Sequence, residues 1–354
     1  MTQRQITVMI TAIGGIGYGQ QILKALRMAP CHRYRLIGAD IDQGCPQQQL
    51  VDSFIALPLA VDSTYLESLL RVCQEESVDV LFAGCDPELR IISRHRTKFL
   101  DRGIYLPMQE EGLIDLCLNK YKTAMRLEEL RWPHPESELI HGLDTSVWTR
   151  GYPVVLKPAA DSVGSAGVYI AQTASELKAL TQFLRLDRDD SSYLLQEYIG
   201  DPDSEYTVGI LHDAGGEHIS SIGVRRRLSG SLSVRLDYAN RTSRPELGTR
   251  LVISSGVSQG DVGRFDSVTS QCRQLAELLG SRGPLNIQCR VVDGDVWVFE
   301  INPRLSGTTA MRAIAGCNEP DMQIRRHIFG EHCEPSIVKG ETTILRSLCE
   351  TVVS

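Results

Sequence analysis

The sequence has no CxxC pair, no cysteine–histidine group at zinc-site spacing, and no apolar run of the about 18–20 residues that a membrane span requires. Its ten cysteines are scattered, which favours a reducing cytoplasm over a secreted, disulfide-bonded chain. Lys and Arg number 37 against 44 Asp and Glu, and the resulting net charge of −7 argues against nucleic-acid binding. We therefore expect a cytoplasmic protein with no nucleic-acid or membrane partner.

Two common catalytic signatures are also missing. No GKS or GKT follows four free positions after a glycine, so the chain has no Walker A loop. No Ser/His/Asp or Cys/His arrangement indicates a nucleophilic side chain. Any phosphate chemistry must therefore use other residues.

The 354 residues suffice for two or three domains. Strand and helix patterns alternate through residues 1–117, with a last strand expected at 103–108, and this rhythm predicts a parallel sheet covered on both faces. After a helical stretch at 110–135, most strand patterns suggest antiparallel pairing. We expect an α/β plus α+β protein, with a Rossmann-like domain at 1–117, a small subdomain at 118–198 and a larger one at 199–354.

The glycines of GGIGYG (14–19) lie where the first strand meets the first helix, as in a dinucleotide-binding fingerprint. That fingerprint needs G-x-G-x-x-G, but the sixth position counted from Gly15 is Gln20. Asp40 and Asp42 do close the second strand, where a ribose contact would lie. We interpret the segment as a tight turn beside an interdomain cleft, with nicotinamide or flavin binding as the alternative.

A polar constellation occurs in LNIQCRVVDGDVWVFEINPR (285–304), which predicts a β-hairpin. Side chains alternate along a strand, so Val298, Glu300 and Asn302 are expected on one face. Arg304 follows with the same parity, just past a proline. The strand thus aims a carboxylate, a carboxamide and a guanidinium at one place.

The other strand of this hairpin adds two polar side chains. With a three-residue loop at 293–295, Gln288 is expected opposite Glu300, and Asn286 opposite Asn302, all on one face. Oxygen ligands of this kind, partly charged and partly neutral, suit Mg²⁺, which keeps waters and substrate phosphates as its other ligands. The alternative is a solvated sheet face with incidental polar residues.

A phosphate-binding segment is expected at 154–168, VVLKPAADSVGSAGV, where a strand ends in Lys157. The ammonium of Lys157 can pair with a phosphate, and a loop of small residues lets backbone N–H groups approach phosphate oxygens. A plain flexible hairpin is the alternative. The loop residues in question are Ser162, Gly164, Ser165 and Gly167.

The order of these pieces resembles the ATP-grasp superfamily and, within it, single-unit proteins similar to carbamoyl phosphate synthase. The resemblance covers nearly the whole chain. It implies an N-terminal Rossmann-like pre-ATP-grasp parallel sheet followed by a two-subdomain ATP-grasp fold that clamps ATP. The stretches that carry it are LNKYKT (118–123), 154–168, LLQEYI (194–199), GPLNIQ (283–288) and VFEINPR (298–304), supported by RLIGADID (35–42), VDVLFAGCDPEL (78–89) and AGCNEPDMQIR (315–325).

The resemblance also implies a role for each matched residue. Gln196 stands where many relatives have a carboxylate, which matters little if the main chain makes the adenine contact. The implied phosphate ligands are Lys120 and Lys157; the implied adenine contacts come from the main chain of Gln196, Glu197, Tyr198 and Ile199; Glu205 would hold the ribose. Two Mg²⁺ ions, with Mn²⁺ as a substitute, would bind Gln288, Glu300 and Asn302, and Arg304 would lie against the transferred phosphoryl group.

The resemblance implies a ligase that activates a small-molecule carboxylate as an acyl phosphate and couples it to an amine. The alternatives are a related acyl-phosphate or carbamate-forming enzyme with another nucleophile, and a nucleotide-binding protein without catalysis. A homodimer is compatible with each of these hypotheses.

Four features remain as candidates for the acceptor pocket. Arg225 and Arg227 lie two apart on one strand face and could bind the acceptor carboxylate, with a solvated basic edge as the alternative. Backbone N–H groups in 306–309, before a helix, could hold an anion, and Glu88 could contact substrate. Segment 228–250 is longer than expected and could reshape the pocket.

Overall fold

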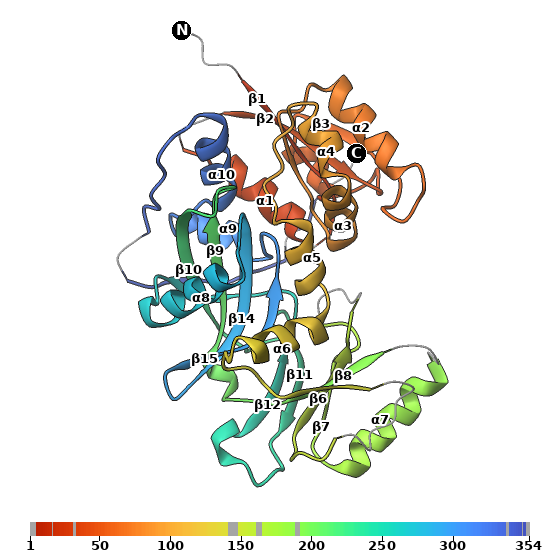
Figure 1. Ribbon diagram of the computed structural model, residues 1–354, viewed down its shortest axis with the longest axis vertical. Coiled ribbons are helices and arrows are strands. Elements are labelled where there is room, and N and C mark those ends of the chain that lie inside the picture. Colours follow the sequence, from red (N-terminus) through yellow and green to blue (C-terminus); the bar gives the residue numbers. More distant parts are fainter. Residues whose placement is uncertain are drawn as a thin grey trace.

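The computed structural model describes residues 5–15, 17–30, 33–140, 148–160, 165–187, 192–337, 340–348 and 350–351. Its elements form three groups along the long axis, with the N-terminal sheet at one end and β6–β8 with α7 at the other (Figure 1). Within the described residues, no helix combines the length and apolarity that a membrane crossing needs.

The N-terminal part is a four-stranded parallel sheet in the order β3-β2-β1-β4, which confirms the expected architecture. The expected strand at 103–108 is reduced to a parallel bridge between Val80 and Tyr105, and Pro107 there has no N–H to extend a ladder. The strands are β1 (Ile6–Ile10), β2 (Tyr34–Asp40), β3 (Ser53–Ala56) and β4 (Val80–Phe82); the helices are α1 (Tyr18–Arg27), α2 (Tyr65–Glu75), α3 (Asp86–Arg94) and α4 (Arg96–Leu100), with a 3₁₀ helix at Pro46–Leu50.

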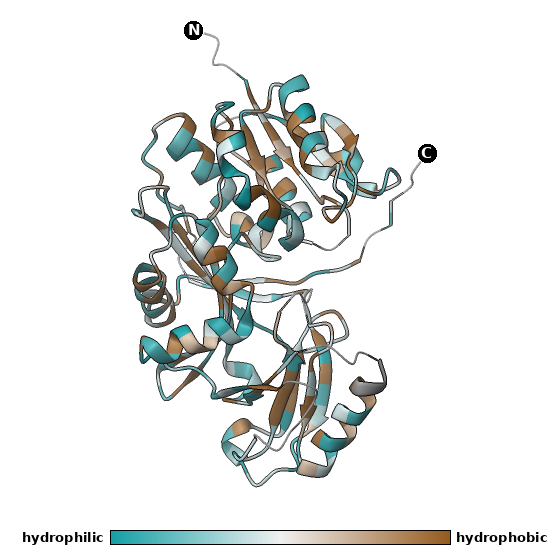
Figure 2. Ribbon diagram, turned by 45° about the vertical axis from the view of Figure 1, so that its right-hand side comes forward, coloured by the Kyte–Doolittle hydropathy of each residue, from teal (hydrophilic) through white to brown (hydrophobic). Residues whose placement is uncertain are grey.

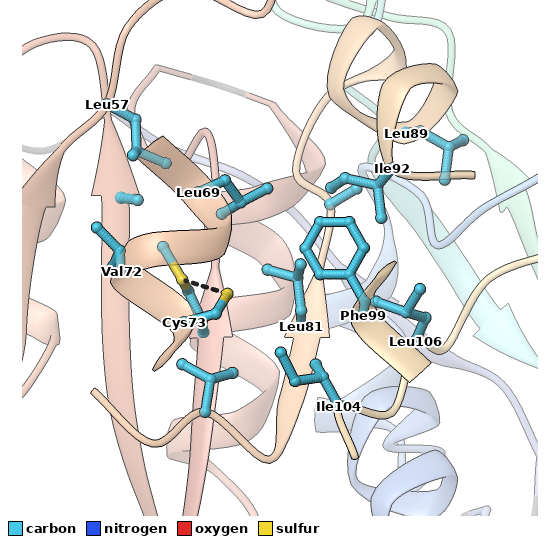
Figure 3. Packing of buried hydrophobic residues seen from close by; sticks show 14 of the residues in the cluster. Leu57, Leu69, Val72, Cys73, Leu81, Leu89, Ile92, Phe99, Ile104 and Leu106 are labelled. Atoms are coloured by element: carbon cyan, nitrogen blue, oxygen red, sulfur yellow. Dashed lines mark hydrogen bonds between the residues drawn. The ribbon is translucent and has the colours of Figure 1, made fainter. Parts of the chain in front are cut away.

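Two apolar clusters cover the faces of this sheet. On one face, Leu69 of α2, Ile92 of α3 and Phe99 of α4 pack over the strands (Figure 3). The opposite face packs against α1, and the same cluster includes Leu305 and Ile324 from the C-terminal part of the chain. The first domain is therefore joined to the rest of the protein by a shared hydrophobic core.

The middle of the chain begins with two helices and continues into a small antiparallel sheet of order β5-β8-β6-β7. The Asn119 side chain accepts a hydrogen bond from the Lys122 N–H (3.0 Å), which caps the second helix. The elements are α5 (Glu111–Cys117), α6 (Lys120–Glu129), β5 (Ser137–Ile140), β6 (Val154–Pro158), β7 (Tyr169–Ala171), α7 (Ala174–Asp187) and β8 (Tyr193–Glu197). Leu177 of α7 packs on Leu156 and Leu195 of the sheet.

A six-stranded antiparallel sheet of order β15-β14-β9-β10-β13-β16 forms most of the remainder. One face packs on α8 and α6, and part of the other face packs on α9 and α10. The elements are β9 (Glu205–His212), β10 (His218–Arg226), β13 (Gly260–Gly263), α8 (Asp266–Leu278), β14 (Pro284–Val292), β15 (Asp295–Asn302), α9 (Thr309–Ile314), α10 (Glu319–Ile328) and β16 (Thr342–Ile344), with a 3₁₀ helix at Pro202–Ser204.

Segment 228–250 forms most of a separate two-stranded sheet, in which β11 (Val234–Ala239) pairs with β12 (Arg250–Ser254) around a 3₁₀ helix at Pro245–Leu247. Leu247 and Leu251 pack on Val155 and Ile170 of the small sheet. Figure 2 shows hydrophobic residues concentrated along the strands of the sheets. The division at 117/118 and 198/199 stays a proposal.

Candidate active site

One cavity of about 580 Å³ lies where these parts of the chain meet. Its walls come from the small sheet, the large sheet, the start of α6 and the start of α3. Most of the residues predicted from the sequence line it, although they are scattered along nearly 200 positions of the chain: Lys120, Lys157, Ser165, Gln196, Glu197, Tyr198, Ile199, Glu205, Gln288, Glu300, Asn302 and Arg304.

The β14–β15 hairpin pairs Gln288 with Glu300, which is the expected register, but reaches it differently. The turn has two residues, Asp293 and Gly294, with φ of 52° and 89°, instead of three. A β-bulge at Phe299 then restores the register. The predicted loop length is therefore wrong, while the predicted pairing is right.

The bulge also resets which side chains share a face. Val298 and Ile301 both point into the apolar core, whereas Phe299, Glu300 and Asn302 line the cavity. The expectation that Val298 shares the face of Glu300 is wrong because simple alternation holds only on either side of a bulge.

Three oxygen-bearing side chains of this hairpin meet at the cavity: Gln288, Glu300 and Asn302. Oδ1 of Asn302 also accepts a hydrogen bond from Nη2 of Arg304 (3.1 Å). Among the described residues, no group of three His, Cys, Asp or Glu side chains could hold a metal by itself. One carboxylate with two amide oxygens fits Mg²⁺ that shares its coordination with phosphate oxygens, and does not fit zinc.

Asn286 faces the same way but has structural partners. Its Oδ1 accepts hydrogen bonds from Thr207 Oγ1 (2.9 Å) and from Arg312 Nη2 (2.7 Å). Nη1 of Arg312 lies 3.3 Å from both carboxylate oxygens of Glu319, and all three side chains are buried. A Cβ on Gly209 would collide with this guanidinium, so the strand needs a glycine there. Asn286 thus anchors the hairpin over a buried ion pair.

Lys157 is the second-last residue of β6, close to the strand end where it was expected, and is buried in the cavity wall. Its Nζ donates to Gln196 Oε1 (2.7 Å) and to the carbonyl of Phe299 (3.2 Å). Burial lowers the pKa of Lys157 to about 7, which the Glu300 carboxylate opposes and the Lys120 ammonium reinforces. The N–H of Lys120 donates to the carbonyl of Ala159 (2.8 Å), which brings the two lysines together.

The Ser/Gly loop after Lys157 is described in part. Ser162 and Gly164 lie outside the described residues, and Ser165 lines the cavity. Gly167 has φ of 72° and makes the turn into β7; it is not among the residues that line the cavity. The predicted phosphate contacts of this loop stay a prediction.

Residues 196–199, at the end of β8, line the cavity, and some of their backbone N–H groups are already hydrogen-bonded within the protein. The N–H groups of Glu197 and Tyr198 donate to the carbonyls of Glu136 (2.8 Å) and Pro153 (3.3 Å). An adenine contact from these two peptides must therefore use their carbonyl oxygens.

Glu205 lies between two buried arginines that the sequence reasoning missed. Its Oε1 accepts from Arg226 Nη1 (3.2 Å), and its Oε2 accepts from Arg290 Nε (3.2 Å) and Nη2 (3.0 Å). Arg226 and Arg290 both line the cavity. Two guanidinium groups thus share one carboxylate, which leaves positive charge in the cavity wall.

Arg225 and Arg227 do not reach the cavity. Both pair with Asp261, at 3.2 and 2.8 Å, on the opposite face of β10, and Arg225 also pairs with Glu341 (2.8 Å). The middle arginine, Arg226, faces inward because strand side chains alternate. The hypothesis of an Arg225–Arg227 carboxylate clamp is corrected accordingly.

Arg304 connects the large sheet to the first domain. Its Nε donates to Oδ1 of Asp86 (3.1 Å), and its guanidinium carbon lies 4.4 Å from the ring centroid of Tyr18. The neighbouring Glu88 points away, into the first domain, where it accepts from Thr11 Oγ1 (2.5 Å) and burial raises its pKa. Asp86, not Glu88, lines the cavity.

Backbone N–H groups at 306–309 and in the glycine loop are already partly occupied by acceptors of the protein itself. The N–H groups of Ser306, Thr308 and Thr309 all donate within their own turn. The N–H of Gly14 donates to Oδ2 of Asp40 (2.7 Å), so this carboxylate occupies a glycine-loop amide.

Two family models match the chain. Residues 10–106 match the PylC-like, N-terminal domain, and residues 254–344 match the ATP-grasp in the biosynthetic pathway with Ter operon. The second match contains the hairpin strand with Glu300, Asn302 and Arg304. The chain contains an ATP-grasp domain.

Curated relatives resemble the chain over much of its length. The chain is 25% identical to the arginine-specific carbamoyl phosphate synthase large chain of Geobacillus stearothermophilus over 74% of its own length and 23% of the relative's. It is 27% identical to the carbamoyl phosphate synthase large chain of Archaeoglobus fulgidus, over 66% of its own length and 20% of the relative's. The chain spans about a quarter or less of these relatives.

The fold is shared with three ATP-grasp neighbours of low sequence identity. An ADP complex of N5-carboxyaminoimidazole ribonucleotide synthetase superposes with a TM-score of 0.66 at 16% identity, over 95% of this chain and 81% of that one. Biotin carboxylase from Campylobacter jejuni superposes with a TM-score of 0.63 at 15% identity, over 91% of this chain and 70% of that one. The L-amino acid ligase from Bacillus licheniformis gives 0.61 at 16%, over 92% and 74%.

Sequence reasoning missed Arg226, Arg290 and Asp86 in this cavity. Arg290 could have been found, because Asn286, Gln288 and Arg290 alternate along β14. Asp86 carries no such signal, since nothing in the sequence places the start of α3 beside Arg304.

Proposed function

We propose that the protein is an ATP-dependent ligase that converts a carboxylate to an acyl phosphate and couples it to an amine, releasing ADP and phosphate. One observation carries the proposal: a single cavity collects two lysines, three oxygen ligands and Arg304, which are the groups that phosphoryl transfer needs. The solved neighbours support it, since they are complexes with ADP, with β,γ-ATP and with MgADP.

The nucleotide would occupy the space between the two α+β sheets. Lys120 and Lys157 would contact its phosphates, and the carbonyl oxygens near Gln196 would face adenine. Glu205 lines the same cavity, and a ribose contact would share its oxygens with Arg226 and Arg290.

Gln288, Glu300 and Asn302 would hold Mg²⁺, with Mn²⁺ as a substitute. When bound, the metal neutralises phosphate charge and aligns the phosphoryl group. The hairpin and the Asn286–Arg312 contact beneath it fix these side chains before any ligand arrives.

The acceptor carboxylate would bind between Arg226 and Arg304. A carboxylate is a poor acylating agent because its leaving group is oxide, whereas an acyl phosphate releases phosphate. Arg304 stabilises charge on the transferring group, and Arg226 supplies positive charge that Glu205 only partly balances.

A related carbamate-forming or other acyl-phosphate enzyme is the second candidate, because the curated relatives include carbamoyl phosphate synthase large chains. Bicarbonate as the required acid would identify it. A small organic carboxylate as the required acid would identify the ligase.

The test combines ATP, Mg²⁺ and an array of carboxylates with hydroxylamine, which traps acyl phosphates as hydroxamates. We expect ADP and hydroxamate to form together with at least one carboxylate, and Glu300→Ala to abolish both while the protein stays folded. An array with bicarbonate included that yields neither ADP nor hydroxamate contradicts the proposal, as does full activity of Glu300→Ala.

A further inference from the structure

Asp86 is the carboxylate of the cavity that has no role in nucleotide or metal binding. Of the described residues that line the cavity, four are carboxylates: Asp86, Glu197, Glu205 and Glu300. Glu197 pairs with Arg244 (3.1 Å), Glu205 pairs with two buried arginines, and Glu300 belongs to the proposed metal set. Asp86 belongs to the first domain, at the start of α3.

One oxygen of Asp86 is occupied and the other is open. Its Oδ1 accepts hydrogen bonds from Tyr18 Oη (3.2 Å) and Arg304 Nε (3.1 Å). Within the part of the chain that the structure describes, its Oδ2 makes no hydrogen bond. A quarter of the Asp86 side chain is exposed. The carboxylate is therefore held from one side and presents one oxygen to the cavity.

We propose that Oδ2 of Asp86 binds the ammonium group of the amine substrate. This inference rests on the proposed ligase function, because the attacking nitrogen must come within about 3–3.5 Å of the acyl carbon. That carbon would lie next to Arg304, which places the amine site within reach of Asp86. An open carboxylate oxygen at this point selects a cation.

The helix that carries Asp86 also indicates what the amine is attached to. Arg90, which has a partner of its own, lines the cavity on this helix; so do Pro87 and Ile91, which lie four apart on the same helix face. They offer the substrate an apolar surface next to the carboxylate. The inferred substrate class is a primary amine with an apolar group close to its nitrogen.

The reaction balances with this assignment. The ammonium form of the amine loses one proton to solvent. The neutral amine then attacks the acyl carbon; the C–N bond forms, the C–O bond to phosphate breaks, and the electron pair leaves with phosphate. The second N–H proton ends on phosphate, so one amide, one hydrogen phosphate and one proton result.

A binding experiment tests the inference without turnover. Saturation-transfer NMR at low ionic strength would use benzylamine, butylamine and amino-acid methyl esters as probes. We expect wild type to bind at least one probe, and Asp86→Asn to weaken that binding at least tenfold. Asp115→Asn is the matched control, since Asp115 is a partly exposed helix carboxylate outside the cavity lining.

A kinetic split distinguishes amine binding from a purely positioning role through Arg304. We expect Asp86→Asn to lower the rate with a bound primary amine at least ten times more than the rate with hydroxylamine, which is largely uncharged at pH 8. Asp86→Glu keeps the charge and should retain more amine binding than Asp86→Asn. It also serves if the asparagine variant does not fold.

The inference is overturned if no probe binds to wild type, or if Asp86→Asn leaves probe binding unchanged. Equal losses with hydroxylamine and with the primary amine also overturn it, because Asp86 would then act through Arg304 alone. A failure of the ligase function looks different, since wild type would form no hydroxamate with any carboxylate whatever the binding result.

Discussion

The ammonium nitrogen of Lys157 lies 2.7 Å from the side-chain oxygen of Gln196, a neutral partner in a buried position. Nε2 of Gln196 donates in turn to Ser137 Oγ (3.0 Å), which fixes the orientation of the amide. The side chain at position 196 therefore matters, although only its main chain was expected to. Without a counter-charge at this contact, burial dominates and lowers the pKa of Lys157 to about 7.

Nucleotide binding should take up a proton at pH 8. In the nucleotide-free protein, Lys157 is mostly neutral at this pH. A polyphosphate beside it raises the pKa of Lys157, so the protein takes up as much as about one proton for each nucleotide bound. Calorimetry of a non-hydrolysable ATP analogue in buffers with different ionisation enthalpies measures this uptake. The Lys157→Met variant should bind the ATP analogue more weakly and without proton uptake. Binding by wild type without proton uptake would contradict the role of Lys157.

Gln196→Glu should change how stability depends on pH. In wild type the unfolded state holds more protons on Lys157 than the folded state between about pH 7 and 10, so this lysine makes the protein more stable as pH rises through that window. A carboxylate at position 196 raises the pKa of Lys157 and removes most of that gain. Between pH 7 and 9 the difference in unfolding free energy should reach about 2 kcal/mol. Parallel curves for both proteins in urea titrations would refute it.

Removing one partner of the Arg312–Glu319 ion pair should destabilise the protein more than removing both charges. Both side chains are buried and lie 3.3 Å apart. Arg312→Met leaves an unpaired buried carboxylate and should lower the unfolding free energy by about 3–5 kcal/mol. Adding Glu319→Gln should recover at least half of that loss in urea titrations. A double variant as unstable as Arg312→Met would show that the loss comes from the Asn286 contact.

The sequence predicted the fold and the β14–β15 pairing because both follow from local patterns. Alternation and an Asp-Gly turn specify a hairpin, and the strand-helix rhythm specifies a parallel sheet. The shorter turn and the bulge at Phe299 each shift the register by one residue, and the two errors cancel. A bulge leaves no mark on simple alternation, so the placement of Val298 could not be predicted.

Two other features of the site were not predicted: which face of β10 lines the cavity, and which elements far apart in the sequence come into contact. Alternation shows that Arg226 faces opposite to Arg225 and Arg227, but not which face is buried, because three consecutive arginines place the same charge on both faces. The contact of Asp86 with Arg304 joins two domains across more than 200 positions. Such contacts depend on how the domains dock, which local sequence does not encode.

Neighbouring arginines of β10 provide a matched test of the acceptor site. Arg226 is buried in the cavity wall and donates to Glu205 and Ser254, whereas Arg225 is partly exposed and pairs with Asp261 on the opposite face. If Arg226 holds the acceptor carboxylate, Arg226→Met should lower carboxylate-dependent ADP formation about 12- to 140-fold, mainly through a higher KM for the carboxylate, since a charged hydrogen bond contributes about 1.5–3 kcal/mol. Arg225→Met, which removes the same charge from the same strand, should stay within about threefold of wild type, because surface ion pairs contribute little. Circular dichroism verifies that both variants fold. Equal losses in the two variants would mean that the charge of β10 acts at a distance, and a loss confined to Arg225→Met would return the acceptor site to the opposite face of the strand.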